Sequence, residues 1–267
     1  MAVIERTLPR PGVALLTLNR PEQLNAMTAE LVESLHEHLA ELAVDPDVRV
    51  VVLTGAGRGF CAGLDLGGYG EAPHTSQLGP TQRGFAVQKH IATLIPQLRS
   101  LPQPVIAAVN GPAAGGGLAL VLGSDVRIAS TAAVFNAAFI RIGLSACDIG
   151  TSWLLPRLVG VARAQELMLT GRLFAADEAH RIGLVVELHE PDALLAAALA
   201  KADQVLANAP FGVSLTKEAM WTALEIPGMQ AAIDLENRQQ IMASATHDHR
   251  EALEAFLEKR PPRFANR

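Results

Sequence analysis

The sequence predicts an α/β fold that gives way to a mostly helical C-terminal third. Short segments rich in β-branched residues alternate with an amphipathic helical segment in the first two-thirds of the chain. Two glycine-bearing loops each follow one of these segments. From about residue 159 onward, the apolar residues recur mostly at helical spacing.

The first elements are two strands separated by a helix. VALLTL (13–18) and VRVVVL (48–53) have the short, β-branched composition of strands. Between them, residues 28–43 place leucines three to four positions apart, with Thr28 able to cap the helix start. These leucines are Leu31, Leu35, Leu39 and Leu42.

Two more strands and several helices follow. VIAAV (105–109) and VRIA (126–129) are the next predicted strands. Residues 68–84 are rich in Gly, Pro and polar residues, which predicts a long mobile loop, and residues 86–98 predict a helix. Later helices are predicted for the segments ARAQELMLT, ALLAAALAKADQVLA, SLTKEAMWTAL and DHREALEAFLEKR.

Composition limits the class of protein. The 267 residues, of which 49% are hydrophobic, suit one large globular domain or a domain with a helical extension. A net charge of −5 argues against a nucleic-acid partner, and no segment is apolar for long enough to span a membrane. The N-terminus lacks a signal-peptide pattern, and Cys61 and Cys147 are too few for a disulfide framework. We therefore expect a cytoplasmic protein with buried, structural cysteines.

The two glycine loops do not match a dinucleotide site. TGAGRGFCAGLDL (54–66) follows the second predicted strand, and NGPAAGGGLAL (110–120) follows VIAAV. In the first loop Gly55, Gly57 and Gly59 are spaced G-x-G-x-G, and Phe60 stands where the dinucleotide fingerprint needs its third glycine. Glycines let a ligand lie against backbone N–H groups, so one amide from each loop could form an oxyanion hole. From the sequence, close packing explains the glycines equally well.

Four stretches carry a family resemblance: residues 18–27, 50–66, 104–130 and 154–185. They include LNRPEQLNAM, VVVLTGAGRGFCAGLDL and PVIAAVNGPAAGGGLALVLGSDVRIAS, in that order. The chain resembles the enoyl-CoA hydratase/isomerase (crotonase) family from about residue 10 to its C-terminus. The resemblance implies a spiral ββα core over residues 1–195. It also implies a helical region over residues 196–267 that builds a homotrimer or homohexamer and covers the active site.

The resemblance also implies an acyl-CoA substrate and a set of site residues. The thioester oxygen would accept hydrogen bonds from the backbone amides of Leu64 and Gly116. Coenzyme A enters only as part of the substrate, and neither a separate cofactor nor a metal ion is expected. The other residues that the resemblance assigns to substrate binding are Arg20, Asn25, Ala62, Asp65, Leu66, Gly115 and Phe139.

The usual acids and bases of the family are missing. The two glutamates of its hydratases correspond to Ala119 and Phe139, neither of which can carry a proton. Asp148, in the loop before the helix expected near Thr151, matches the catalytic aspartates of some family members to within one position. Asp148 is therefore the candidate catalytic residue, although an aspartate there could also cap that helix.

Other polar residues have a simpler interpretation. His90, on the helix expected over 86–98, is a weaker acid–base candidate, and Arg141 is expected to be a structural or surface residue. His247 and His249 have no metal-like partners in the sequence. Two basic residues near the C-terminus, Lys259 and Arg260, could reach a CoA phosphate on a neighbouring subunit or belong to a charged tail.

Three functions remain open from the sequence. The leading one is a hydratase- or isomerase-like enzyme that stabilises a thioester enolate. The second is an acyl-CoA hydrolase or dehalogenase in which Asp148 is the nucleophile. The third is an acyl-CoA binding protein without catalysis, suggested by Ala119 and Phe139.

Overall fold

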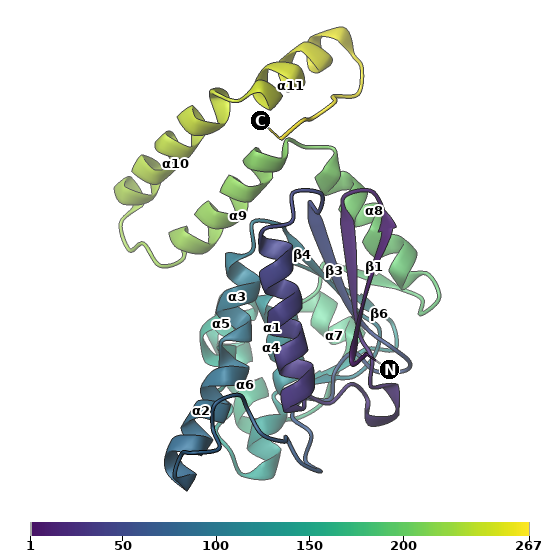
Figure 1. Cartoon of the computed structure of the whole chain (residues 1–267), viewed down its shortest axis with the longest axis vertical. Helices are drawn as coiled ribbons and strands as arrows, with labels where there is room; N and C mark the ends of the chain where they lie inside the picture. The colour runs from purple at the N-terminus through teal and green to yellow at the C-terminus, as the bar shows by residue number, and fades with distance from the viewer. Residues whose placement is uncertain (1, 267) are drawn as a thin grey trace.

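The computed structural model describes residues 2–266, which contain a six-stranded sheet and a smaller three-stranded sheet (Figure 1). The main sheet has the strand order β1-β2-β3-β4-β6-β9. Only β1 and β2 pair antiparallel, and the remaining pairs are parallel. Its strands are β1 (Ile4–Arg10), β2 (Val13–Leu18), β3 (Val50–Gly55), β4 (Val105–Val109), β6 (Val126–Ser130) and β9 (Glu187–His189). The four predicted strands are confirmed, with β3 starting two residues later than expected.

Helices cover both faces of the main sheet, which explains the uninterrupted apolar composition of its strands. Val50 and Val52 face α8 (Leu194–Leu206) and form a buried cluster with Ala198 and Ala202 of that helix. Alternate residues such as Val51 and Leu53 belong to the opposite and larger core. That core also contains side chains of α1 (Ala29–Ala43), α3 (Leu94–Ser100) and α4 (Gly116–Gly123).

The first helix forms as predicted. Thr28 is its N-cap, and the Thr28 hydroxyl accepts a hydrogen bond from the backbone N–H of Leu31 at 3.3 Å. All four leucines of its predicted stripe are fully buried. Burial of one such side chain contributes about 1.5–3 kcal/mol, so this stripe fixes α1 to the sheet.

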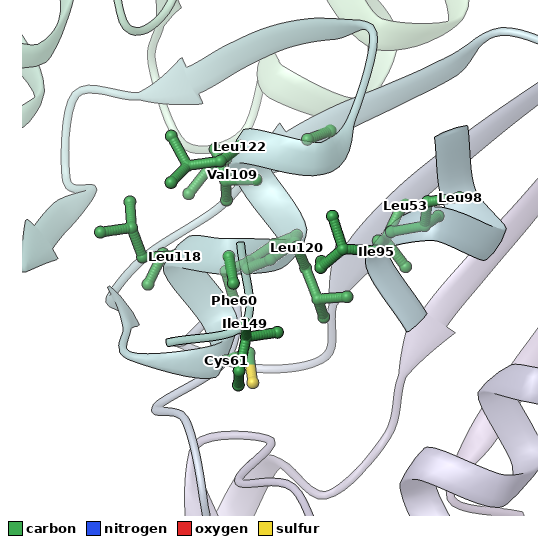
Figure 2. Close-up of a cluster of buried hydrophobic side chains, with 14 of the residues drawn as sticks. Leu53, Phe60, Cys61, Ile95, Leu98, Val109, Leu118, Leu120, Leu122 and Ile149 are labelled. Carbon is green, nitrogen blue, oxygen red and sulfur yellow. The ribbon is translucent and has the colours of Figure 1, made fainter. Parts of the chain in front are cut away.

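The second glycine loop leads into a helix at the centre of the larger core. Every residue of α4 is buried. Leu118, Leu120 and Leu122 point from α4 into apolar side chains of several other elements (Figure 2). The three-stranded sheet lies at the start of this helix and consists of β5 (Ala113–Ala114), β7 (Val134–Asn136) and β8 (Phe174–Ala175). The surrounding core therefore holds the N-terminus of α4 in place.

The predicted loop over residues 68–84 is wrong beyond residue 79. A helix, α2 (Pro80–Ala92), begins there with Gly79 as N-cap and Pro80 in its first turn, a position that proline favours. The helix predicted over 86–98 is two helices, α2 and α3, which meet at Thr93. Proline and glycine occur at helix starts as well as in loops. The composition of this segment therefore predicted that the loop would end later than it does.

The C-terminal part is helical, as predicted. It contains α5 (Thr151–Val159), α6 (Val161–Thr170), α7 (Ala176–Arg181), α8, α9 (Pro210–Ala223), α10 (Met229–Ser244) and α11 (His247–Glu258). The last three lie beyond one end of the core (Figure 1). The expected boundary at residues 195–196 falls inside α8, which packs on the sheet. Within residues 2–266, no helix has both the length and the apolar character needed to cross a membrane.

Candidate active site

The first glycine loop leaves one backbone amide without a partner. Met27 donates its N–H to the carbonyl of Gly63 at 2.7 Å, and the N–H of Asp65 donates to the carbonyl of Met27 at 3.0 Å. Because successive residues of an extended segment direct their N–H groups to opposite sides, the N–H of Leu64 points away from Met27. Within residues 2–266 this amide has no hydrogen-bond acceptor.

The second loop supplies a similar amide. Gly116 is the first residue of α4, so its N–H has no carbonyl partner within the helix, and none is present elsewhere in the described chain. Gly115 precedes it at φ +49° and ψ −116°, a conformation suited to glycine. The N-terminal end of α4 adds the positive end of the helix dipole at this point.

Close backbone contacts hold the two loops together. The N–H of Ala114 donates to the carbonyl of Cys61 at 3.0 Å, and Cys61 and Ala113 form a parallel bridge. A Cβ atom on Gly117 would lie 2.0 Å from the carbonyl oxygen of Cys61, and one on Gly63 would lie 3.4 Å from the nitrogen of Gly116. Glycine at these positions is therefore what allows the Leu64 and Gly116 amides to approach each other.

Both amides belong to residues that line one cavity of about 110 Å³. Its wall is mainly apolar, and Asp148 is the one titratable side chain among the residues that form it. The lining residues are Met27, Ala62, Gly63, Leu64, Leu66, Gln88, Ile91, Gly115, Gly116, Ala138, Phe139, Ile142, Leu144, Asp148 and Ile149. Two unpaired amides in residues that line one such cavity could stabilise an oxyanion, and each donor of this kind contributes about 3–4 kcal/mol in a transition state.

Asp148 does not cap the following helix with its side chain. The N-cap of α5 is Gly150, and the N–H of Thr151 donates to the backbone carbonyl of Asp148 at 2.8 Å. The Asp148 carboxylate instead accepts hydrogen bonds from the side-chain amide of Gln88 and from the N–H of Ile149, the latter at 2.8 Å. The capping alternative is therefore wrong for the carboxylate, which is left at the cavity.

The turn that carries Asp148 has an unusual backbone. Ile149 has φ +46°, which is rare for a β-branched residue, and Gly150 follows at φ +75°. The Ile149 side chain is buried, with its Cδ1 3.5 Å from the position of a Cβ on Gly116. Packing against the N-terminus of α4 offsets the local strain and places Asp148 beside the cavity.

The two positions that correspond to the hydratase glutamates, Ala119 and Phe139, both have apolar surroundings. Ala119 is fully buried in α4, and Phe139 lies in the cavity wall next to Gly115. Phe139 belongs to a 3₁₀ turn, η2 (Ala138–Ile142). Neither position brings an ionisable group to the cavity.

Arg20, Asn25 and Asp65 support the first loop from behind. Asn25 is fully buried, and its side-chain amide donates to the carbonyls of Ala56 and Gly59 at 3.0 and 2.8 Å. Arg20 donates to Asp65 at 2.9 Å, and this contact is the main reason that the pKa of Asp65 lies below its ordinary value. These three residues are absent from the cavity wall, whereas Ala62 and Leu66 belong to it.

The weaker acid–base candidate is separated from the cavity. His90 contacts the hydroxyl of Tyr69 at 2.9 Å and the carboxylate of Glu33 at 2.8 Å, and it is not among the cavity residues. Both ring nitrogens therefore already have partners. His90 ties the 68–79 segment and α2 to α1.

The two cysteines differ from each other. Cys61 is fully buried as expected, and burial raises the pKa of its thiol to about 12. Cys147 is exposed, so the expectation that it is buried is wrong. Cys147 immediately precedes the turn that carries Asp148, and at this surface position its side chain does not enter the core.

The remaining sequence candidates lie on the surface or in local ion pairs. Arg141 is exposed, as expected, and has no ion-pair partner within residues 2–266. Arg260 pairs with Glu251 and Glu258 in the same chain, while Lys259 ends α11. His247 and His249 start α11, and no cluster of metal-binding side chains occurs in the described part of the chain.

Sequence reasoning missed two contributors to the site. Gln88 is an ordinary polar residue on α2, and only the fold brings it to Asp148. The strained conformation of Ile149 likewise has no signal in its residue type, because isoleucine does not favour positive φ.

An α/β core of this topology, with two unpaired amides in residues that line one apolar cavity, is typical of an enzyme of the crotonase class. Residues 10–267 match the enoyl-CoA hydratase/isomerase family model. The chain is 44% identical over 259 residues to a probable enoyl-CoA hydratase of Mycobacterium tuberculosis, covering 97% of this chain and 91% of that protein. It is 41% identical to the 1,2-epoxyphenylacetyl-CoA isomerase of Escherichia coli, with 96% of each covered.

Solved structures agree with the sequence relatives. A probable enoyl-CoA hydratase/isomerase from Mycobacterium abscessus superposes with a TM-score of 0.94 at 40% identity, and the match covers 99% of both chains. This chain therefore belongs to the enoyl-CoA hydratase/isomerase family, and it is an enzyme of the lyase or isomerase type.

Proposed function

We propose that this enzyme moves a proton on an acyl-CoA thioester by way of an enolate. The thioester oxygen accepts hydrogen bonds from the N–H groups of Leu64 and Gly116, which lower the energy of the charge that develops on it. The observation that carries this proposal is the common cavity of both unpaired amides and the Asp148 carboxylate.

Asp148 is the proton-transfer group in this proposal. Its carboxylate removes a proton from a carbon next to the thioester, and the electron pair moves onto the thioester oxygen. The same carboxylate then returns the proton to another carbon, which gives a double-bond isomer. A single titratable group favours such an isomerisation over hydration, since addition of water by this family's hydratases uses two carboxylates.

The substrate is bound around this centre. Ala62, Leu66, Gly115 and Phe139 contact the acyl or pantetheine portion, while Arg20, Asn25 and Asp65 hold the loop that meets the nucleotide portion. The apolar wall provided by Phe139 and its neighbours suits a bulky or aromatic acyl group. Coenzyme A is part of the substrate and no other cofactor takes part.

Oligomerisation through the C-terminal helices is part of the same proposal. α10 and α11 expose large apolar side chains, including Met229, Ile241 and Phe256. Exposed apolar surface of this kind marks an interaction site. A homotrimer or homohexamer would cover it.

The test is turnover of a panel of enoyl- and aromatic acyl-CoA thioesters, followed by mass spectrometry and chromatography of the products. With the substrate that is converted, Asp148→Asn is expected to lower kcat by about 10²–10⁴-fold, the usual contribution of a general base. Full turnover by Asp148→Asn would remove the carboxylate from the mechanism. Tight binding of thioesters without conversion of any would instead indicate a binding protein.

A nucleophilic role for Asp148 is the second candidate, since the same carboxylate is the one ionisable group in the cavity wall. In a dehalogenase its oxygen would attack the carbon of the acyl chain that bears the halogen, halide would depart with the bonding electrons, and water would hydrolyse the aspartyl ester. In a hydrolase it would attack the thioester carbonyl, the CoA thiolate would depart, and water would hydrolyse the mixed anhydride. Rapid-quench mass spectrometry distinguishes the two roles, because only the nucleophilic one yields a covalent adduct on Asp148.

A further inference from the structure

The Asp148 carboxylate is held through one of its two oxygens. The side-chain N–H of Gln88 and the backbone N–H of Ile149 both donate to Oδ1. The second oxygen, Oδ2, has no hydrogen-bond or ion-pair partner within residues 2–266. One oxygen thus anchors the group and the other is available to a ligand in the cavity.

We propose that Gln88 is the positioning residue of this enzyme, which fixes the Asp148 carboxylate so that Oδ2 is the atom that exchanges the proton. The proposal rests on the proposed role of Asp148. It adds a residue from a different element, since Gln88 lies 60 positions earlier in the chain on α2.

The local backbone does not fix the carboxylate by itself. The N–H of Ile149 belongs to the next residue and moves with the same turn, in which Ile149 is left-handed and buried. A contact from α2 ties the carboxylate to a second element, and so restricts rotation about the Asp148 side-chain bonds. Misplacement of a reacting group by about 1 Å can cost 10²-fold in rate.

A neutral donor suits this task. A cationic partner such as Arg20 holds Asp65 firmly, but it also lowers the pKa of that carboxyl. The amide of Gln88 donates a hydrogen bond without placing a positive charge beside Asp148. The carboxylate is therefore oriented by a hydrogen bond from a neutral group rather than by an ion pair.

The contact between Gln88 and Asp148 links the packing of α2 to the orientation of the Asp148 carboxylate. Ile91, near the C-terminal end, is the one buried residue of α2. Residues 81–85 are all exposed, and Phe85 retains 76% of its accessible surface. The first turns of the helix therefore pack little against the rest of the chain. Gln88 is the residue of α2 that donates a hydrogen bond to Asp148.

The experiment compares kcat and KM of Gln88→Leu with those of the wild type on the converted thioester. Leucine removes the donor at similar length. Gln88 is exposed, so the fold should tolerate the change, and a thermal melt checks this. Gln82→Leu, on the same helix and outside the cavity, is the matched control. We expect kcat to fall by about 10–100-fold in Gln88→Leu, with little change in KM and no change in the control.

A double-mutant cycle separates positioning from direct contact. If Gln88 acts through Asp148, Gln88→Leu has no further effect in the Asp148→Asn background. An unchanged kcat in Gln88→Leu, or an equal loss in both backgrounds, would overturn the proposal while Asp148→Asn independently tests the proposed function.

Discussion

Asp148 and Cys61 show how residue type and surroundings together decide reactivity. Asp148 is ionisable and lines the cavity, whereas the thiol of Cys61 is enclosed by the core beneath the first glycine loop. Asp148 became the candidate acid–base group through the family resemblance, which places Ala119 and Phe139 at the usual glutamate positions and a catalytic aspartate of some members within one position of Asp148. Its contact with Gln88 could not be foreseen, because it depends on how two distant elements pack.

The two cysteines lead to a prediction at this scale. In the folded protein at pH 8, a thiol-alkylating reagent is expected to modify Cys147 and to leave Cys61 unmodified. Burial raises the pKa of Cys61 to about 12, so its reactive thiolate is scarce below that pH as well as inaccessible. Peptide mass spectrometry before and after denaturation measures both sites. Rapid modification of Cys61 in the folded protein would contradict the described burial.

At the scale of the elements, α4 is the scaffold of the site. Its buried apolar side chains fix its N-terminus, and its glycines let the first loop approach to hydrogen-bonding distance. The second loop therefore needs its glycines both for packing and for an accessible amide. The two interpretations that the sequence left open are compatible.

Gly117→Ala tests this close approach. Its new Cβ would lie 2.0 Å from the carbonyl oxygen of Cys61, so the loops must separate. We expect a loss of stability of about 1–3 kcal/mol and a strong loss of turnover, measured by thermal unfolding and steady-state kinetics.

Gly84→Ala in α2 is the matched control, since a Cβ there meets nothing within 4 Å. Alanine favours a helix by about 1 kcal/mol over glycine, so this variant should be as stable as the wild type or more so. Equal stability and turnover in both variants would show that the loops are not closely packed.

The strands and first helix were predictable because their apolar patterns match a sheet with two covered faces and a one-sided helix. The start of α2 at Pro80 was not, since glycine and proline precede loops and helices alike. α10 was also missed. Most of its residues are exposed, so it lacks the buried stripe that reveals a helix in sequence.

On the scale of the whole molecule, the core and the last three helices have different surfaces. The core buries its apolar residues on both sides of the sheet, whereas α10 and α11 keep several large apolar side chains exposed. Such a surface is stable in water when another copy of the chain covers it. This is the physical basis for the proposed oligomer.

Phe256→Asp in α11 tests that oligomer. Phe256 is 80% exposed in the single chain, so the folded subunit should tolerate the change while its interface does not. We expect light scattering coupled to gel filtration to show a smaller assembly than in the wild type. Glu254→Gln on the same helix serves as the control, and a monomeric wild type would contradict the proposed assembly.

The central claim is that the Leu64 and Gly116 amides stabilise an enolate that Asp148 generates. Exchange of the α-protons of an acyl-CoA thioester, such as phenylacetyl-CoA, with deuterium from heavy water measures this step directly by mass spectrometry. The wild type should incorporate deuterium at the α-carbon, and Asp148→Asn should do so at least about 100-fold more slowly. Exchange at the same rate in both proteins would contradict enolate formation by Asp148.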